Sequence, residues 1–389
     1  MEKLQVGVIY GGRSVEHEVS IISALQAIRA LPAERYEAVP IYISKQGQWY
    51  SGDALLDLAN YKNLDSLLAE CRPVYFSPNY QDWQLLSSAR QGLFAKPWQK
   101  RLDLAFPVIH GTFGEDGSLQ GLLELSGIPY VGAAVLGSAI GMDKIVTKAI
   151  LQEAGLPVTR YTWFGSHEWQ SSREAVVKRI LEQIELPLVV KPANLGSSVG
   201  ISRVDSRLAL EEAIDLAVSF SSRIIIEEAI EPLRELNCAV LGMAADLEIS
   251  AIEEPLSANE LLSFSDKYLS SGTKGMSGAK RRIPADITPE IAQKIVDLAK
   301  RTFSALDGQG VCRIDFLYNP QTEMLYVNEA NTIPGSLAFY LFEPQGKSFS
   351  QLVDSLLQQA LARYRDQQKL IYTYDSNILA QGGFKGKSR

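Results

Sequence analysis

Four polar residues are spaced so that a β-hairpin over residues 311–331 would gather them at one site. In this segment apolar and polar residues alternate up to an Asn-Pro turn, and a second strand-like run follows it. Because strand side chains alternate with a period of two, Arg313 and Asp315 share one face, as do Glu329 and Asn331 on the return. Two carboxylates and an amide are oxygen ligands that suit Mg²⁺, and the arginine can neutralise them or bind an anion. The alternative is an exposed hairpin with a solvated ion pair.

A glycine- and serine-rich loop at residues 191–200 follows a short predicted strand and begins with a lysine. Backbone N–H groups in such a loop can turn toward an anion, and the hydroxyls of Ser197 and Ser198 add donors. The loop is not a Walker motif, in which Gly-Lys-Ser/Thr opens a helix. It predicts either an anion-binding loop headed by Lys191 or a hairpin turn with a surface lysine.

Two further polar segments follow strands of a predicted N-terminal sheet. In residues 11–20, a Gly-Gly turn places Glu16 near a helix N-terminus, where an open α/β sheet binds its ligands; helix capping is the alternative role. Residues 110–117 begin with His110, which is either close to a ligand or a satisfied buried histidine. With only three histidines in the chain, we do not expect a His-based metal site.

The segment 263–282 is long, basic and rich in glycine, and it contains Lys267 and Tyr268. Long loops in a compact domain are usually functional or disordered. As a functional element, this one would be a lid that closes over phosphates and excludes water.

The elements that must position these residues begin with alternating short strands and helices, which predict a parallel α/β domain over residues 1–135. Strands are expected at 4–10, 36–43 and 102–109, and helices at 19–31 and 118–126. Residues 50–100 show weak periodicity and are expected to form an insertion of loops and short strands.

From residue 144 onward the pattern changes. Strands are expected at 188–191, 201–204 and 223–228, and helices at 144–154 and 208–218. A mixed α+β block begins near Glu235, and its helix at 289–306 has Pro289 in the first position and Thr288 as a candidate cap. The Gly- and Lys-rich segment at 381–389 is expected to be disordered.

The composition limits the classes of function. The chain has 389 residues, which suits two or three domains, and its 46% apolar and 21% charged residues are typical of a folded globular protein. The formal charge is −7 without a basic stripe, so we expect no nucleic-acid partner. Three widely separated cysteines predict neither a disulfide framework nor a zinc site. No signal peptide or bilayer-spanning run is recognisable, so we expect a cytoplasmic protein without a membrane partner.

Six motifs, taken together and in order, resemble those of the ATP-grasp superfamily, and within it the D-alanine–D-alanine ligases. They are Gly-Gly-x-Ser-x-Glu-x-x-Val-Ser at 11–20, His-Gly-x-x-Gly-Glu-Asp-Gly at 110–117, Met-Asp-Lys at 142–144, Lys-Pro-x-x-x-Gly-Ser-Ser-Val-Gly at 191–200, Arg-Ile-Asp at 313–315 and Asn-Glu-Ala-Asn-Thr-x-Pro-Gly at 328–335. The resemblance extends from about residue 4 to about residue 360.

The resemblance implies a three-domain ATP-grasp architecture of α/β and α+β type with an N-terminal parallel α/β (pre-ATP-grasp) domain. Its bounds would be 1–135 for the N-terminal substrate-binding domain, 136–228 for the central subdomain, 229–365 for the C-terminal subdomain with the lid and metal site, and 366–389 for the tail. It also implies ATP-dependent joining of two D-alanine molecules through an acyl phosphate, giving D-alanyl-D-alanine, ADP and phosphate for peptidoglycan precursor synthesis. A homodimer is expected by the same analogy.

The resemblance also implies roles for individual residues. Glu16 would grip the ammonium of the first D-alanine, Ser197 and Tyr268 would link to Glu16, and His110 would stand close to that substrate. Arg313 and the N–H of Gly335 would form an oxyanion site. The nucleotide contacts would be Lys144, Lys191, Ser198, Glu227, Glu228, Ile230, Glu235 and Lys267. Two Mg²⁺ ions, or Mn²⁺ in their place, would be held by Asp315, Glu329 and Asn331, with Glu329 bridging.

The second-substrate site departs from the family pattern. Tyr340 stands five residues after Gly335, where these ligases usually carry a serine that helps to hold the second substrate's carboxylate. The Tyr340 hydroxyl can donate from a longer arm, or Ser336 can replace the serine by a shift of register. An acceptor such as D-lactate, D-serine or another amino acid is therefore an alternative to D-alanine. A non-catalytic nucleotide-binding scaffold is a further alternative, against which the complete Arg313, Asp315, Glu329 and Asn331 set argues.

Overall fold

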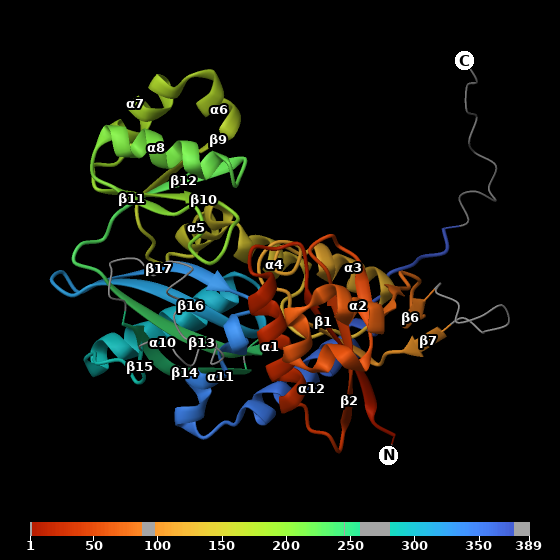
Figure 1. The fold of residues 1–389 in the computed structure, drawn as a ribbon. Helices are drawn as coiled ribbons and strands as arrows, with labels where there is room; N and C mark the ends of the chain where they lie inside the picture. The colour runs from red at the N-terminus through yellow and green to blue at the C-terminus, as the bar shows by residue number, and fades with distance from the viewer. Residues whose placement is uncertain (1, 88–97, 245, 257–280, 377–389) are drawn as a thin grey trace.

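The computed structural model describes residues 2–87, 98–244, 246–256 and 281–376. In these residues the strands form two five-stranded sheets, one four-stranded sheet and one small three-stranded sheet. Figure 1 shows the central four-stranded sheet and its helices above the C-terminal sheet, with the N-terminal sheet beside both. The mixture of parallel and antiparallel sheets covered by helices is the predicted α/β and α+β class.

The N-terminal sheet has the strand order β4-β3-β2-β1-β8. Its central strand β1 (Leu4–Gly11) pairs in parallel with β2 (Tyr36–Ile43) and with β8 (Leu104–Pro107), as the sequence predicts. Helix α1 (His17–Ala30) begins two residues earlier than predicted, and α3 (Ser118–Ser126) has the predicted bounds. Parallel pairing brings the carboxyl ends of β1 and β8 to one edge, where the two polar segments begin.

The insertion after β2 consists of short elements, as its weak periodicity predicts. They are β3 (Trp49–Ser51), the 3₁₀ turns at Asp53–Leu56 and Leu58–Lys62, α2 (Leu64–Glu70), β4 (Arg72–Pro73), β5 (Tyr75–Phe76), β6 (Gln84–Ser87) and β7 (Trp98–Arg101). Strands β3 and β4 extend the N-terminal sheet, and β5, β6 and β7 form the small sheet.

The central sheet is antiparallel, with the order β11-β10-β12-β9. Its strands are β9 (Tyr161–Gly165), β10 (Leu188–Pro192), β11 (Ser202–Val204) and β12 (Arg223–Glu228). Helices α6 (Ser166–Ser171), α7 (Arg173–Gln183) and α8 (Arg207–Val218) accompany it, and α7 and α8 bury their apolar stripes against it. Helices α4 (Val135–Met142) and α5 (Lys144–Glu153) lead into it from the N-terminal domain.

The C-terminal sheet has the order β15-β14-β13-β16-β17. Its strands are β13 (Arg234–Met243), β14 (Asp246–Pro255), β15 (Arg281–Arg282), β16 (Gln309–Asn319) and β17 (Met324–Asn331). Helix α10 (Pro289–Ala305) buries Ile291, Ile295, Ala299 and Phe303, which recur every four residues, against this sheet. The predicted cap forms, since Thr288 Oγ1 accepts a hydrogen bond from the N–H of Ile291 at 3.4 Å.

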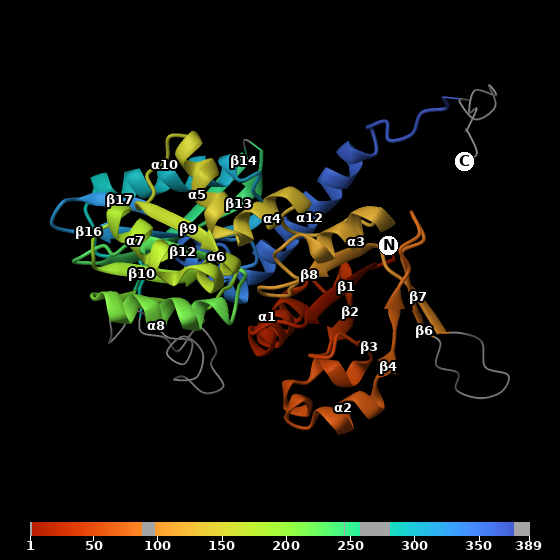
Figure 2. The same ribbon diagram turned by 90° about the horizontal axis from the view of Figure 1, so that it is seen from above.

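After β17 the chain turns through Gly335–Ala338 and α11 (Phe339–Phe342) into the long helix α12 (Phe349–Gln367). This helix, which the sequence analysis did not anticipate, lies against the N-terminal domain (Figure 2). Its buried leucines share one hydrophobic cluster with β1 and α1. Arg35 binds Asp354 of α12 through two hydrogen bonds of 2.7 and 2.8 Å. The C-terminal chain therefore fastens the N-terminal and C-terminal sheets together.

Candidate active site

The predicted hairpin forms, and its register brings the four polar residues together. In the pairing of β16 with β17, Arg313 lies opposite Asn331, and Asp315 lies opposite Glu329. Arg313 donates to Asp315 from Nε to Oδ1 at 2.7 Å and from Nη2 to Oδ2 at 2.8 Å. Their side chains are only 14% and 15% exposed, so this is not the solvated ion pair of the alternative interpretation. We call these four residues the hairpin cluster.

The donor set of the hairpin cluster fits a divalent metal. Asn331 Nδ2 donates to Asp315 Oδ2 at 3.2 Å, so the amide and the carboxylate lie side by side. A carboxylate has about four lone-pair directions, so Asp315 can accept these donors and still ligate a cation. Within the described part of the chain, no three His, Cys, Asp or Glu side chains gather into a metal site. Two carboxylates and an amide instead suit a hard cation that shares its shell with phosphate oxygens.

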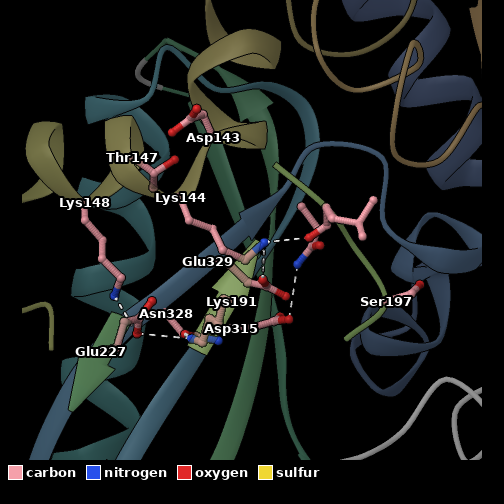
Figure 3. Close-up of polar contacts among 12 residues, drawn as sticks. Asp143, Lys144, Thr147, Lys148, Lys191, Ser197, Glu227, Asp315, Asn328 and Glu329 are labelled. Carbon is pink, nitrogen blue, oxygen red and sulfur yellow. Dashed lines mark hydrogen bonds and ion pairs between the residues drawn. The ribbon is translucent and has the colours of Figure 1, made fainter. Parts of the chain in front are cut away.

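Two lysines reach strand β17 of the hairpin from the side of the central sheet (Figure 3). Lys144, the first residue of α5, donates from Nζ to the carbonyl of Leu195 at 2.8 Å, and the same atom lies 3.5 Å from Glu329 Oε2. Lys191, near the end of β10, donates to Asn328 Oδ1 at 3.1 Å. It is 6% exposed, so it is not the surface lysine of the alternative interpretation. The predicted phosphate lysines and the predicted metal ligands therefore face one another.

A second charged group lies deeper in the central sheet, and we call it the central cluster: Lys148, Thr159, Lys191 and Glu227. Glu227 Oε2 lies 3.2 Å from Lys148 Nζ and 3.1 Å from Lys191 Nζ, and it accepts from Thr159 Oγ1 at 2.9 Å. Although burial raises the pKa of Glu227, the two ammonium groups outweigh it and lower the pKa to about 2. The sequence analysis missed Lys148 and Thr159. Lys148 follows Lys144 by one helical turn, and that spacing was a usable signal.

Glu16 is linked to the glycine-rich loop, as expected. Ser197 Oγ donates a hydrogen bond to Glu16 Oε1 across 181 residues of sequence. Glu16 is the N-cap residue of α1, but among the described residues its side chain makes no capping hydrogen bond to the helix. The loop approaches so closely that a Cβ on Gly196 would lie 2.6 Å from Glu16 Oε2. The N-terminal domain and the central sheet therefore meet at this carboxylate.

His110 is a buried histidine with both ring nitrogens hydrogen-bonded. Nδ1 lies 2.6 Å from the carbonyl of Ile333, and Nε2 lies 2.8 Å from Ser23 Oγ. Burial lowers its pKa, which favours the neutral ring. The neighbouring Glu115, which the sequence analysis did not single out, accepts from the N–H of Ile333 at 2.7 Å. Both residues therefore attach the 110–117 segment to the turn that precedes Gly335; a contact of His110 with substrate stays a prediction.

The turn that begins at Gly335 has an unusual backbone. Ser336, Leu337 and Ala338 all have left-handed φ angles of 51°, 53° and 52°, which cost energy in residues other than glycine. The N–H of Ser336 donates to Ser23 Oγ at 3.0 Å, so α1 helps to hold the turn. Strained backbone of this kind clusters at binding sites.

Tyr340 follows this turn and has partners of its own. Its hydroxyl donates to Glu253 Oε2 at 3.2 Å, and the Arg281 guanidinium lies 4.3 Å from the ring centroid. Arg281 also pairs with Glu253 at 3.0 Å. Glu253 was not singled out from the sequence, and Arg281 was expected only as part of the basic lid segment 263–282, because no spacing connects either residue to Tyr340.

The remaining predicted residues lie on or beside strands β12 and β13. Glu228, the last residue of β12, pairs with Arg160 at 2.8 Å, and Glu235 lies in β13 opposite Leu317. Ile230 lies in the connection between the two strands, and Ser198 follows Ser197 in the loop. Lys267, Tyr268 and most of the predicted lid lie outside the described residues. All three cysteines are buried and free, and none of the described helices is long and apolar enough to cross a membrane.

Comparison with known proteins assigns both halves of the chain to one family. Residues 5–133 match the family model of the D-Ala–D-Ala ligase N-terminus, and residues 150–358 match that of the C-terminus. The chain is 38% identical over 378 residues to a D-alanine–D-alanine ligase from Thermosipho melanesiensis, covering 97% of this chain and 98% of that one. It is 40% identical to a D-alanine–D-alanine ligase from Natranaerobius thermophilus, over 95% and 98% of the two chains.

Solved structures agree with this assignment. The D-alanine–D-alanine ligase from Coxiella burnetii superimposes with a TM-score of 0.77 at 32% identity, covering 95% of this chain and 97% of that one. The VanG D-Ala:D-Ser ligase from Enterococcus faecalis has the same TM-score at 31% identity, covering 92% and 100%. The chain therefore belongs to the D-alanine–D-alanine ligase family and is an ATP-dependent carboxylate–amine ligase.

Proposed function

We propose that this chain joins two D-alanine molecules at the site described above, giving D-alanyl-D-alanine, ADP and phosphate for peptidoglycan precursor synthesis. The observation that carries the proposal is the position of Lys144. Its ammonium contacts the Leu195 carbonyl in the Gly/Ser-rich loop and lies 3.5 Å from Glu329 of the hairpin cluster. One cation thus connects the segment that would bind phosphate with the segment that would bind metal. Family membership and the similarity over nearly the whole chain support the choice of substrates.

ATP would bind between the central and C-terminal sheets. The residues that would contact its phosphates are Lys144, Lys191, Ser198 and, from the lid segment, Lys267. The residues that would lie along its adenosine are Glu227, Glu228, Ile230 and Glu235. Two Mg²⁺ ions, or Mn²⁺ in their place, would be held by Asp315, Glu329 and Asn331, with Glu329 bridging. A divalent metal bound there neutralises charge on the phosphates.

Glu16 would bind the ammonium of the first D-alanine, held in place by Ser197 and, from the lid, Tyr268. The carboxylate of this D-alanine would attack the γ-phosphorus of ATP, which gives an acyl phosphate and releases ADP. The amine of the second D-alanine would then attack the acyl carbon, and phosphate would leave. Arg313 and the N–H of Gly335 would stabilise the negative charge on the carbonyl oxygen during this attack. Exclusion of water by the lid would prevent hydrolysis of the acyl phosphate.

The acceptor site is where this chain departs from the family pattern. Tyr340 replaces the expected serine. Its hydroxyl lies at the end of a much longer side chain than that of serine, and it donates a hydrogen bond to Glu253. Ser336 is buried in the strained turn, where its N–H is bonded to Ser23. We propose that Tyr340 and Ser336 border the second-substrate site and that D-alanine is the acceptor there.

The experiment that tests the function measures phosphate release with ATP and D-alanine alone, then with D-alanine plus D-serine, D-lactate and other amino acids, with products identified by mass. We expect turnover with D-alanine alone and a product with the mass of D-alanyl-D-alanine. Turnover only with another acceptor would replace D-alanine in the second site. No turnover with any acceptor would contradict the catalytic assignment.

The family resemblance also supports proposals for the domain boundaries, the cellular location and the oligomeric state. We propose domain boundaries near residues 135, 228 and 365, with residues 366–389 as a tail. The enzyme would act in the cytoplasm, where ATP is supplied, as a homodimer. Sedimentation of the purified chain distinguishes a dimer from a monomer.

A further inference from the structure

Helix α5 presents two lysines one turn apart, and only the first belongs to the site proposed above. Lys144 reaches the glycine-rich loop and Glu329, whereas Lys148 extends toward Glu227 (Figure 3). The Lys148 side chain is 0% exposed and that of Glu227 is 1% exposed. Burying a lysine is costly unless its charge is paired and hydrogen-bonded. The position therefore requires an explanation beyond packing.

The hydrogen bonds of Glu227 are distributed unevenly between its two oxygens. Oε2 accepts from Thr159 Oγ1 at 2.9 Å and lies within 3.2 Å of both Lys148 and Lys191. Lys148 Nζ also donates to Thr159 Oγ1 at 3.0 Å, which closes a ring of three side chains. Oε1 is buried and has no hydrogen-bond partner among the described residues. A buried acceptor of this kind destabilises the folded protein unless a ligand supplies a donor.

Two cations on one oxygen are more than neutralisation of Glu227 needs. Lys191 alone would balance the charge of Glu227, and it is also tied to Asn328 of β17 at 3.1 Å. Lys148, in the middle of α5, and Thr159, in the connection that leads into β9, add a second set of contacts on the same oxygen. The consequence of this arrangement is that the carboxylate cannot rotate without losing contacts at Oε2. Oε1 is thereby held as a fixed acceptor.

We propose that Lys148 is a positioning residue for nucleotide recognition: with Thr159 it holds Glu227 through Oε2, so that Oε1 accepts a hydrogen bond from the amino group of the adenine base. The inference rests on the proposed binding of ATP along β12. A fixed carboxylate oxygen favours a base with an amino group at the 6-position. It disfavours a base with an oxo group there, because two acceptors would face each other without a proton.

The test compares ATP with inosine triphosphate, whose base carries an oxygen in place of the 6-amino group. In the parent enzyme we expect KM for inosine triphosphate to exceed KM for ATP by about tenfold or more, the ratio that one lost hydrogen bond to a charged group produces. Lys148→Met should raise KM for ATP by about tenfold, keep kcat within about threefold, and reduce the nucleotide ratio to below about threefold. Thr159→Val should change the ratio in the same direction by a smaller factor.

The control is Arg363→Met, which removes a different buried cation. Arg363 lies in α12 and donates to the backbone carbonyls of Tyr130 and Gly132, away from the central cluster. This variant should lose thermal stability and retain the parent's nucleotide ratio. Loss of stability without a change in the ratio is therefore the signature of a structural role.

A parent enzyme that does not discriminate between the two nucleotides would overturn the inference, as would a folded Lys148→Met variant with the parent's ratio. If Lys148→Met does not fold, Thr159→Val decides by the same criterion. Calorimetric binding of each nucleotide, measured without amino acid, separates this inference from the proposed function. Discrimination in binding that disappears in Lys148→Met, in a protein that ligates nothing, would reject the proposed function and retain the role of Lys148.

Discussion

The hairpin cluster and the central cluster are built from the same kinds of side chain, but the chain assembles them in opposite ways. Arg313, Asp315 and Asn331 interact over separations of 2 and 16 residues within one antiparallel pair of strands. The central cluster joins residues 11 and 68 positions apart, and Lys191 continues it over 137 residues to Asn328. Local pairing follows from strand periodicity, whereas the long-range contacts exist only after α5 and the C-terminal sheet have packed against the central sheet.

The two clusters also differ in their access to solvent. Glu329 is 28% exposed and the Arg313–Asp315 pair about half as much, whereas Lys148 and Glu227 are essentially inaccessible. A partly exposed cluster can exchange water for substrate or metal at little cost to the fold. A fully buried one loses a large electrostatic contribution if any member is removed. We therefore expect the hairpin cluster to determine turnover and the central cluster to determine stability and nucleotide selection.

The largest effect is expected in the hairpin cluster. Glu329→Gln keeps the side chain's shape but removes the charge that would bridge the metal ions, so kcat should fall by about 100-fold or more. The melting temperature should stay close to that of the parent. Glu323→Gln, at the exposed end of the same hairpin, is the matched control and should leave both quantities unchanged. Activity within a few-fold of the parent in Glu329→Gln would remove this residue from the metal site.

The next largest effect is on stability, in the central cluster. Glu227→Gln leaves Lys148 and Lys191 without their carboxylate, which should cost about 3–5 kcal/mol at neutral pH. The pKa of Glu227 lies near 2 in the folded protein, well below its ordinary value of 4.5. Its stabilising contribution is therefore complete above pH 4.5 and is lost as the pH falls toward 2. Thermal unfolding of parent and variant should accordingly differ most at neutral pH and converge in acid.

Glu228→Gln is the control for that measurement, since Glu228 is the next residue of β12 and pairs with the largely exposed Arg160. An exposed partner gives a weak ion pair, so the loss should be below about 1 kcal/mol. Equal losses of unfolding free energy in Glu227→Gln and Glu228→Gln, or a difference that does not depend on pH, would show that burial does not strengthen the ion pairs of Glu227.

The smallest effect is expected at Tyr340, where a long-range contact borders the proposed acceptor site. Tyr340→Phe removes the hydrogen bond to Glu253 and keeps the ring beneath Arg281. We expect a loss of about 1 kcal/mol in stability and a several-fold change in the ratio of kcat/KM for D-alanine and D-serine as acceptors. Tyr318→Phe is the matched control, because Arg234 lies over that ring as well. An unchanged acceptor ratio would remove Tyr340 from the second-substrate site.

Much of the fold was predictable because its signals are local. The alternation of residues 311–331 predicted both strands of the hairpin and that the hairpin can bring its four polar residues to one site, whereas the exact pairing of Asp315 with Glu329, next to a register shift, is seen only in the structure. Thr288 and Pro289 predicted the start of α10, which the structure confirms. The contact between Ser197 and Glu16 was expected from the family resemblance, since no periodicity connects residues 181 positions apart.

Other features were not predictable from spacing or composition. Helix α12 packs on the N-terminal sheet although it follows the C-terminal one, because its leucines bury against β1 and α1. The sequence shows that Tyr340 departs from the serine usual in the family. It does not show its partners, because Glu253 and Arg281 come from strands β14 and β15. Such contacts depend on which surfaces become adjacent once hydrophobic burial has ordered the sheets.

The sequence by itself determined the family, the reaction class and the hairpin cluster, because motifs and strand periodicity operate over short separations along the chain. Tertiary structure alone decided that Lys191 is buried, that Lys148 and Thr159 share Glu227 Oε2, and that the other oxygen of Glu227 has no donor among the residues that the structure describes. The reason is physical: the energy of a charge depends on its burial and on its nearest partners. Both are set by segments that lie far apart in the sequence.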